Sequence, residues 1–210
     1  MTKTFWLLYG ASGSGKTTYA QHLVRARQAL RGRTVVIDPT GTLSRFGHVL
    51  SVAGAIKALG QYGPAEPFAL VVQPEWGEKL EDKKKGVSLW KAIFDAQHVL
   101  VLVDETHRYA DANRIDDGLA NLVATGRHHW IDLVTTVQTP PQLHSLFRGN
   151  ADVVVSFAQP YQPYADTLAG QFFGGDASAA AALAALPAYA YLRRDTKTNT
   201  TTHGRVSPCA

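Results

Sequence analysis

The chain contains Gly10-Ala11-Ser12-Gly13-Ser14-Gly15-Lys16-Thr17, a stretch that matches in full the pattern of a phosphate-binding loop. The apolar segment Thr4–Tyr9, which has the length of a strand, comes directly before it, and the helical pattern of Thr17–Leu30 comes directly after it. The pattern is informative where a strand enters the loop and a helix leaves it. Because motif and context agree, the stretch predicts a P-loop that binds the phosphates of a nucleotide.

The residue types of this loop suit the binding of phosphate. Glycine lets the backbone curl so that N–H groups point at phosphate oxygens, and the helix that follows directs its positive end at the same anion. We expect Lys16 to reach the β- and γ-phosphates of ATP and Thr17 to bind Mg²⁺. The alternative is a glycine-rich turn with an exposed lysine. The predicted nucleotide-binding residues are Gly10, Ala11, Ser12, Gly13, Ser14, Gly15, Lys16, Thr17 and Thr18.

An uninterrupted aliphatic run, Val99–Val103, is followed by Asp104 and Glu105. Such a run is typical of a central strand that is covered on both faces of a parallel sheet. A carboxylate at the C-terminal end of this strand lies beside the P-loop, so we expect Asp104 to hold Mg²⁺ through water. Glu105 is placed to polarise the attacking water, which favours hydrolysis over transfer to a small acceptor. The alternative is that the two carboxylates cap a helix.

A third candidate is Gln138, which ends the predicted strand Ile131–Val137. A polar side chain where an inner strand meets the ligand-binding edge can sense the γ-phosphate or the attacking water. The alternative is a surface glutamine that closes a strand.

Strand-length apolar segments alternate with longer helical patterns along the chain. This alternation is typical of βα units, so we predict an α/β P-loop NTPase fold with a mostly parallel central sheet flanked by helices. The 210 residues suit one domain. We predict an ATPase domain over residues 1–195 and a polar, mobile tail over 196–210. Further strands are predicted at Thr34–Asp38, Phe68–Gln73, Val153–Phe157 and Ala188–Arg193, and helices around Trp90 to Phe94 and at Ala177–Leu186.

Composition narrows the class of protein. The net charge of +4 favours contact with phosphates without requiring it. Because Cys209 is the single cysteine, one chain can form neither an internal disulfide nor a thiolate metal site. No apolar run approaches the ~20 residues of a membrane-spanning helix, so we expect a cytosolic protein.

The charged segment Pro74–Gly86 predicts an exposed loop. The tryptophans are expected in the core or in subunit contacts, namely Trp6, Trp76, Trp90 and Trp130.

The stretch from Gly126 to Asp152 adds a more specific pattern. It combines the basic segment Gly126-Arg127-His128-His129 with a strand ending in Thr136-Val137-Gln138-Thr139-Pro140, then Leu143-His144 and Phe147-Arg148-Gly149-Asn150-Ala151-Asp152. Together with the P-loop and the Asp-Glu strand, this pattern resembles the FtsK/HerA superfamily of ring ATPases that pump DNA. The short chain resembles the genome-packaging ATPases of tailless icosahedral viruses with an internal membrane, related to the poxvirus packaging enzyme. Thr139 stands where the superfamily usually has an arginine.

This resemblance implies the roles of the site residues and the partners. It gives Lys16 and Thr17 the Walker A role, Asp104 and Glu105 the Walker B role, and Gln138 the sensor role. It implies a homo-oligomeric ring, expected as a hexamer, that moves double-stranded DNA and meets capsid vertex or portal proteins, in the host cytoplasm or at the packaging vertex of the virion.

In such rings a neighbouring subunit supplies an arginine finger, for which Arg127 and Arg148 are the candidates. DNA would contact loops that line the central pore. The candidates for this contact are Lys83–Lys85 and the basic segment around Arg127.

Three alternatives stay open. The first is an assembly or secretion ATPase of the filamentous-phage type, which the chain resembles less closely. The second is a P-loop kinase that acts on a small molecule, which requires an arginine-bearing lid that Pro74–Gly86 does not offer. The third is a nucleotide-binding switch that drives no movement, which Glu105 disfavours.

Overall fold

The computed structural model describes residues 3–82, 84, 86–175 and 177–208. The expectations for Lys83, Lys85 and Cys209 therefore lie outside the described residues. In chain order the elements are β1 (Phe5–Tyr9), α1 (Lys16–Ala29), β2 (Arg33–Ile37), η1 (Ser44–Phe46), β3 (His48–Leu50), α2 (Val52–Leu59), β4 (Ala69–Val72), β5 (Glu81–Asp82), β6 (Val87–Ser88), α3 (Leu89–Ala96), β7 (Val99–Val103), η2 (Thr106–Arg108), α4 (Asp117–Thr125), η3 (Gly126–His129), β8 (Asp132–Val137), η4 (Pro140–Gln142), α5 (Ser145–Asn150), β9 (Val153–Ser156), α6 (Gln162–Phe172), α7 (Ala177–Ala185), β10 (Ala190–Asp195) and β11 (Thr200–Arg205), where η denotes a short 3-10 helix.

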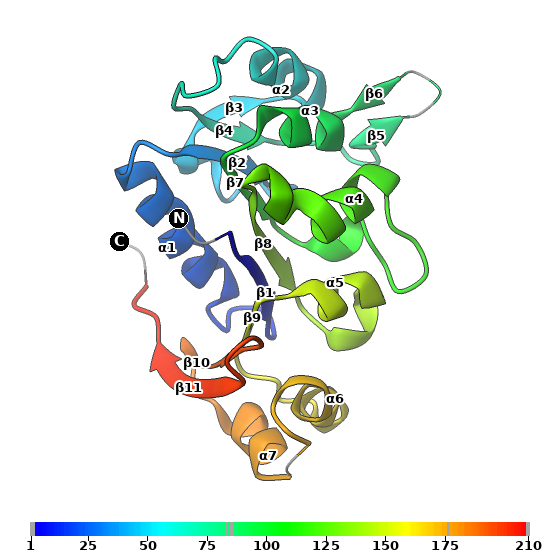
Figure 1. Cartoon of the computed structure of the whole chain (residues 1–210). Coiled ribbons are helices and arrows are strands. Elements are labelled where there is room, and N and C mark those ends of the chain that lie inside the picture. The colour runs from blue at the N-terminus through cyan, green and yellow to red at the C-terminus, as the bar shows by residue number, and fades with distance from the viewer. Residues whose placement is uncertain (1–2, 83, 85, 176, 209–210) are drawn as a thin grey trace.

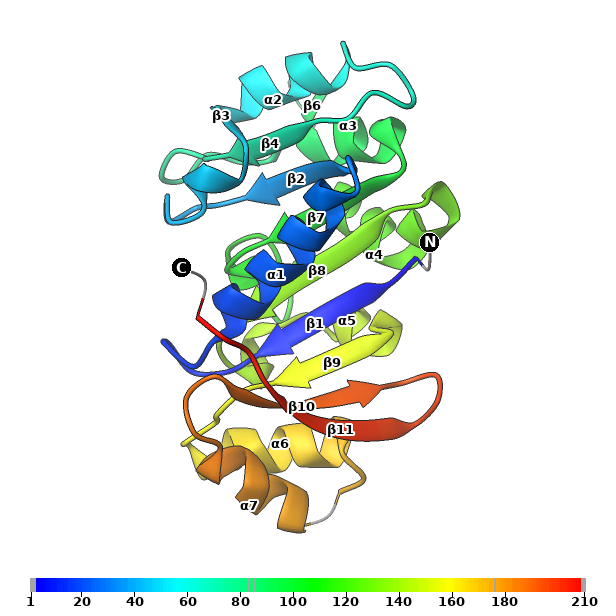
Figure 2. The ribbon, with the colours of Figure 1, turned by 90° about the vertical axis from the view of Figure 1, so that its left-hand side faces the viewer.

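A nine-stranded sheet with the order β11-β10-β9-β1-β8-β7-β2-β4-β3 forms the centre of the molecule. The strands from β9 to β3 pair in parallel, whereas β10 and β11 pair antiparallel. Figure 1 shows α1 on one side of this sheet and α3, α4 and α5 on the other, and Figure 2 shows the strands side by side behind α1. The predicted α/β class with a mostly parallel sheet is confirmed.

Both faces of the sheet are buried at its centre, which is why the central strands are largely apolar. All five residues of β7 are buried, and the alternation of β1 sends Leu7 to one face and Leu8 to the other. The core on the α1 face includes Ala20 and Val24 of that helix, and the core on the opposite face includes residues of α2 to α7.

The segment beyond Thr196 differs from the predicted mobile tail. Residues 200–205 form β11, which pairs with β10 along the edge of the sheet. The carboxylate of Asp195 accepts the N–H groups of Lys197 (3.1 Å) and Thr198 (3.0 Å), and this local bonding turns the chain back on itself. A polar, threonine-rich strand lacks the apolar face by which a strand is recognised, so it was predicted wrongly.

The charged segment Pro74–Gly86 is also more ordered than an exposed loop. It contains β5, which pairs antiparallel with β6, and the side chain of Leu80 is fully buried. Helices α2, α4, α5 and α6 and the short strand β3 were not predicted. None of the helices in the described part of the chain has the length and apolar character needed to cross a bilayer.

Candidate functional site

Four parallel strands place polar residues at one edge of the sheet. The P-loop follows β1, Asp38 follows β2, Asp104 follows β7 and Gln138 follows β8. Because β1, β8, β7 and β2 are neighbours in the sheet, their carboxyl ends meet. This is the edge at which open α/β sheets bind ligands.

The P-loop has a conformation that only glycine allows at two of its positions. At Gly10, with φ of 153°, a Cβ atom would lie 2.5 Å from the Ser14 hydroxyl and 2.7 Å from Cβ of Phe157. At Gly15, with φ of 118°, a Cβ atom would lie 3.1 Å from both the backbone and the ring of Tyr189. The glycines therefore serve the shape of the loop as well as its exposure of N–H groups.

Two features of this loop leave hydrogen-bonding capacity for a ligand. The Oγ atom of Ser14 is buried and has no hydrogen-bond partner among the described residues. Ser12 and Gly13 are exposed at the tip of the loop, and Thr17 and Thr18 are half-buried in the first turn of α1. The start of α1 lacks a side-chain cap, so its N-terminal N–H groups face the region where a phosphate would bind.

Lys16 lies folded over the loop. Its ammonium donates to the carbonyl oxygens of Gly10 (2.6 Å) and Ala11 (2.9 Å). Burial lowers the pKa of Lys16 from 10.5 to about 8, opposed by the charges of Asp104 and Glu105. The lysine is thus a desolvated cation that neutral carbonyls hold in place, and an anionic phosphate would stabilise it better.

Asp104 lies buried at the end of β7. Its carboxylate accepts a hydrogen bond from the Thr136 hydroxyl (2.6 Å), and its own N–H donates to the carbonyl of Ile37 (3.0 Å). Burial raises the pKa of Asp104, the bond from Thr136 opposes this, and the charges of Glu105 and Asp38 add to it. Burial and the neighbouring negative charges thus destabilise the ionised form of this carboxylate. A divalent cation would stabilise it, and Mg²⁺ binds oxygen ligands of this kind.

Asp38 joins this group of carboxylates although it was not predicted as a site residue. Its side chain accepts the N–H groups of Thr40 (3.2 Å), Thr42 (3.3 Å) and Leu43 (2.7 Å), and the hydroxyl of Thr40 (3.0 Å). Since these bonds use its capacity as an acceptor, Asp38 holds the loop after β2 and contributes negative charge to the site.

Glu105 has a left-handed backbone conformation, with φ of 48° and ψ of 52°. Its N–H donates to the Thr136 hydroxyl (3.0 Å), so Thr136 ties Glu105 and Asp104 to β8. Its Oε2 atom accepts a hydrogen bond from Nε of Arg108 at 2.7 Å. Arg108 was missed by the sequence reasoning, although its position three residues after Glu105 could have signalled this pairing.

Gln138 is half-buried directly after β8, and its main-chain carbonyl accepts a hydrogen bond from the side-chain amide of Gln159 (3.3 Å). Its backbone is thus held at the edge where the P-loop, Asp104 and Glu105 meet.

The two candidate finger arginines both have partners within the chain. Arg127 donates to the carboxylate of Asp152 (3.0 Å), which lies at the start of β9 and hence at the opposite edge of the sheet. Arg148 donates to the main-chain carbonyls of Leu143 (2.8 Å) and Pro140 (3.4 Å), in the segment that follows Gln138. The structure therefore places Arg148, and not Arg127, near the edge that carries the P-loop.

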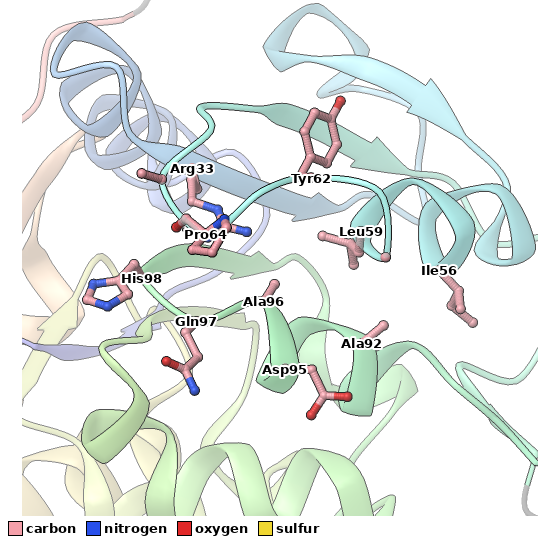
Figure 3. A pocket seen from close by; sticks show the side chains of 12 residues that line it. Arg33, Ile56, Leu59, Tyr62, Pro64, Ala92, Asp95, Ala96, Gln97 and His98 are labelled. Carbon is pink, nitrogen blue, oxygen red and sulfur yellow. Dashed lines mark hydrogen bonds between the residues drawn. The ribbon is translucent and has the colours of Figure 1, made fainter.

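A separate hollow of about 620 Å³ lies at the opposite edge, between α2 and α3. Figure 3 shows Ile56 and Leu59 of α2 across from Ala92 and Asp95 of α3, with Arg33, at the start of β2, to the left beside Pro64. Because the amino ends of β2 and β7 border this hollow, it cannot hold a phosphate that is bound by the P-loop.

Comparison with known proteins gives a family match and several structural matches. The model of the family described as zonular occludens toxin (Zot) matches residues 4–160. No curated protein sequence matches the chain.

The chain is similar in structure to the genome packaging NTPase B204 of Sulfolobus turreted icosahedral virus 2 in complex with ATP-γS, with a TM-score of 0.78 at 16% identity, covering 98% of this chain and 99% of that chain. VirB4 of Thermoanaerobacter pseudethanolicus matches with a TM-score of 0.70 at 10% identity, covering 99% and 90% of the two chains. The N-terminal domain of zonular occludens toxin from Neisseria meningitidis matches with a TM-score of 0.51 at 14% identity, covering 99% and 96%. These structural matches confirm the predicted P-loop NTPase fold.

Proposed function

This chain belongs to the zonular occludens toxin family, and from that premise we propose that it is a Mg²⁺-dependent ATPase that moves double-stranded DNA. The observation that carries the proposal is the convergence of Lys16, Asp104 and Glu105 at the carboxyl edge of the sheet, beside an uncapped α1. Catalysis of phosphoryl transfer is almost entirely positioning and electrostatic stabilisation, and these residues supply the groups for both.

We infer that nucleotide binding uses the P-loop from Gly10 to Thr18. The N–H groups of the loop and of the first turn of α1 hold the phosphates, and Lys16 exchanges its two carbonyl partners for phosphate oxygens. Thr17 and Asp104 would hold Mg²⁺, which would supply positive charge against the phosphates. The complexes of B204 with ATP-γS and with AMPPCP support ATP as the nucleotide.

Hydrolysis requires a group that accepts the proton of the attacking water. Glu105 is that group, because its carboxylate lies one residue beyond Asp104 at the same edge. Gln138, at the end of the neighbouring strand, orients the water or senses the γ-phosphate. A trans arginine completes the site when subunits assemble, since the spreading charge of the transferred phosphoryl group is then stabilised.

Genome packaging is the process that the comparisons support best. B204 is described as a genome packaging NTPase, and its fold matches this chain over 98% of its length. We therefore propose a homo-oligomeric ring, with six subunits as the expected number, that passes viral DNA into a capsid through vertex or portal proteins. The ring would act in the host cytoplasm or at the packaging vertex. The ATPase domain would include β11 in addition to the predicted residues 1–195, because β11 belongs to the central sheet.

The second candidate is an assembly ATPase of the filamentous-phage type. It shares the nucleotide chemistry and differs in what hydrolysis drives, which is movement of protein instead of packaging of DNA. The Zot-family match over residues 4–160 is compatible with it, but the N-terminal Zot domain matches less well than B204, with TM-scores of 0.51 and 0.78. The kinase alternative lacks support, since Pro74–Gly86 carries no arginine for a lid.

The test measures ATP hydrolysis by assembled protein with and without long double-stranded DNA. A packaging motor must pass every sequence, so its contacts favour the phosphate backbone. We expect hydrolysis to increase with DNA of any sequence, and the increase to fall steeply with salt because phosphate contacts release counterions. An equal rate with and without DNA, together with phosphorylation of a small acceptor, would show that the proposal is wrong.

A further inference from the structure

The carboxylate that we assign to water activation is engaged by a cation in this structure. Nε of Arg108 lies 2.7 Å from Oε2 of Glu105, and the two side chains are 35% and 22% exposed. Both residues belong to the turn that follows β7, with Arg108 at the end of η2. A carboxylate paired in this way has its negative charge and one oxygen already committed.

A second contact supports this position of Arg108. The guanidinium carbon lies 5.6 Å from the ring centre of Trp76, on the segment that connects β4 and β5. Trp76 is 92% exposed, so of the two expected locations, the core and a subunit contact, the core is excluded. A cation over an indole face is attracted by the ring, which adds to the ion pair. Arg108 is therefore held between a surface tryptophan and Glu105.

The backbone conformation of Glu105 restricts how far its carboxylate can move away from Arg108. Its left-handed conformation is one that a residue with a side chain adopts at a cost, and the bond from its N–H to Thr136 holds it there. The side-chain bond to Arg108 is thus the contact that fixes the direction of the carboxylate and occupies its Oε2 atom. Because the electrostatic neighbours of Lys16 are Asp104 and Glu105, the carboxylate is near the P-loop while the guanidinium points toward Trp76.

We propose that Arg108 restrains ATP hydrolysis by holding the Glu105 carboxylate in an ion pair, which the nucleic-acid substrate must cause to open, and that Trp76 supports the restrained position. This inference rests on the proposed role of Glu105 in activating water. Arg108 is a positioning residue in this account, since it acts through Glu105 and not on the phosphate.

The competing interpretation is that Arg108 stabilises the transferring phosphoryl group directly. The two interpretations predict opposite changes in ATP turnover when Arg108 is removed. Loss of a restraint increases turnover without DNA, whereas loss of a stabilising arginine decreases turnover under all conditions.

The experiment compares kcat and KM for ATP in assembled full-length protein, with and without DNA. For Arg108→Ala we expect kcat without DNA to rise about two- to fivefold, the factor that a partly exposed ion pair can supply, while KM stays unchanged. The ratio of the rates with and without DNA should fall toward one. Trp76→Ala should give the same change to a smaller degree, and Arg108→Lys an intermediate one, because lysine keeps the charge but not the Nε geometry.

Arg114→Ala is the matched control, because Arg114 is an exposed arginine in the next part of the same connection and contacts Asp111, not Glu105. Its rates should equal those of the unmodified protein. In Glu105→Gln combined with Arg108→Ala, turnover should stay as low as in Glu105→Gln alone.

The outcomes separate this inference from the proposed function. If DNA stimulates the unmodified protein and Arg108→Ala does not raise the DNA-free rate, the inference about Arg108 is wrong, and the proposed function as a DNA-moving ATPase is unaffected. If Arg108→Ala raises the rate of a protein that DNA does not stimulate, the restraint by Arg108 stands, but its release by nucleic acid fails together with the proposed function. A large loss of kcat in Arg108→Ala with unchanged ATP binding would assign Arg108 to the transition state and overturn the restraint.

Discussion

The positive charge of Lys16 is buried, and the carbonyl groups around it offset only part of the cost of this burial. Burial lowers its pKa from 10.5 to about 8 on folding. Between these values the unfolded chain binds more protons than the folded chain, so the free energy of unfolding increases with pH through this window. Below the folded pKa the lysine is charged in both states, and the burial cost is present in full.

We predict that Lys16→Met is more stable than the unmodified protein near pH 7, by on the order of 3 kcal/mol, because the aliphatic side chain removes the buried charge. This advantage should shrink as the pH rises above about 8 and vanish only well above pH 10.5, where the lysine is neutral in both states. Urea unfolding of both proteins at several pH values measures it. A difference that does not change with pH would contradict the assignment of the cost to the charge of Lys16.

Glu105→Gln should bind Mg²⁺-ATP and barely hydrolyse it. The amide keeps the shape of the side chain but cannot accept the proton of the attacking water, and removal of a general base costs about 10²–10⁴-fold in rate. Single-turnover hydrolysis together with equilibrium binding of ATP separates the two effects. Unchanged hydrolysis would remove Glu105 from its proposed role.

Among single residues, those that belong to a short local motif could be predicted from the sequence. Lys16 and Asp104 follow from short patterns that end a strand or begin a helix, and the structure brings them to one edge. The spacing of three residues could have signalled the pair of Arg108 with Glu105. The contact of Arg108 with Trp76 could not be predicted in this way, because it joins segments about thirty residues apart. Arg127 was placed by resemblance alone, and its bond to Asp152 depends on the order of strands.

Among the elements, the β10–β11 hairpin does more than extend the sheet. The N–H of Val206 donates to the carbonyl of Tyr189 (2.9 Å), and the N–H of Tyr189 donates to the carbonyl of Ser14 in the P-loop (2.9 Å). Tyr189 has a φ of 66°, a strained value that these two bonds maintain. The hairpin thus supports the conformation of the P-loop from outside the motif.

We predict that a chain ending at Thr196 loses about 1–3 kcal/mol of unfolding free energy and binds ATP more weakly, because β10 loses its partner and Tyr189 loses its bond to Val206. A chain ending at Pro208 is the control, since it keeps β11 and Val206. Urea unfolding and ATP titration measure both effects. Equal ATP affinity in the two truncated proteins would show that the hairpin does not support the P-loop.

The elements that could be predicted are those with a strong apolar period. Val99–Val103 was predicted with its observed bounds, because only a doubly covered strand is aliphatic throughout. β11 has mostly exposed threonines and was missed, and α4 was missed because it is only nine residues long and follows a polar connection. Tertiary pairing, not local preference, decides such elements.

At the scale of the whole molecule, the proposed ring requires one arginine that reaches across a subunit boundary, and Arg127 and Arg148 differ in the contacts that they would have to leave. Arg127 pairs with a carboxylate that is 4% exposed, whereas Arg148 bonds to neutral carbonyls. A hydrogen bond between charged groups contributes about 1.5–3 kcal/mol, and one to a neutral group about 0.5–1.5 kcal/mol. Arg148 therefore leaves its resting contacts at a lower cost and is the better candidate for a finger that moves at each cycle.

We predict that Arg148→Ala binds ATP normally and loses hydrolysis by about 10³-fold or more, the contribution typical of an arginine finger. Arg127→Ala should instead lose stability, since it removes a charged partner of buried Asp152. Rings that mix Arg148→Ala subunits with Glu105→Gln subunits should recover activity, because at some boundaries an intact Glu105 meets an intact Arg148 from the neighbour. Recovery is measured as ATP hydrolysis against the mixing ratio, with native mass spectrometry to show that rings are mixed. If mixed rings stay inactive, Arg148 acts within its own subunit, and the boundary between subunits does not complete the site through this residue.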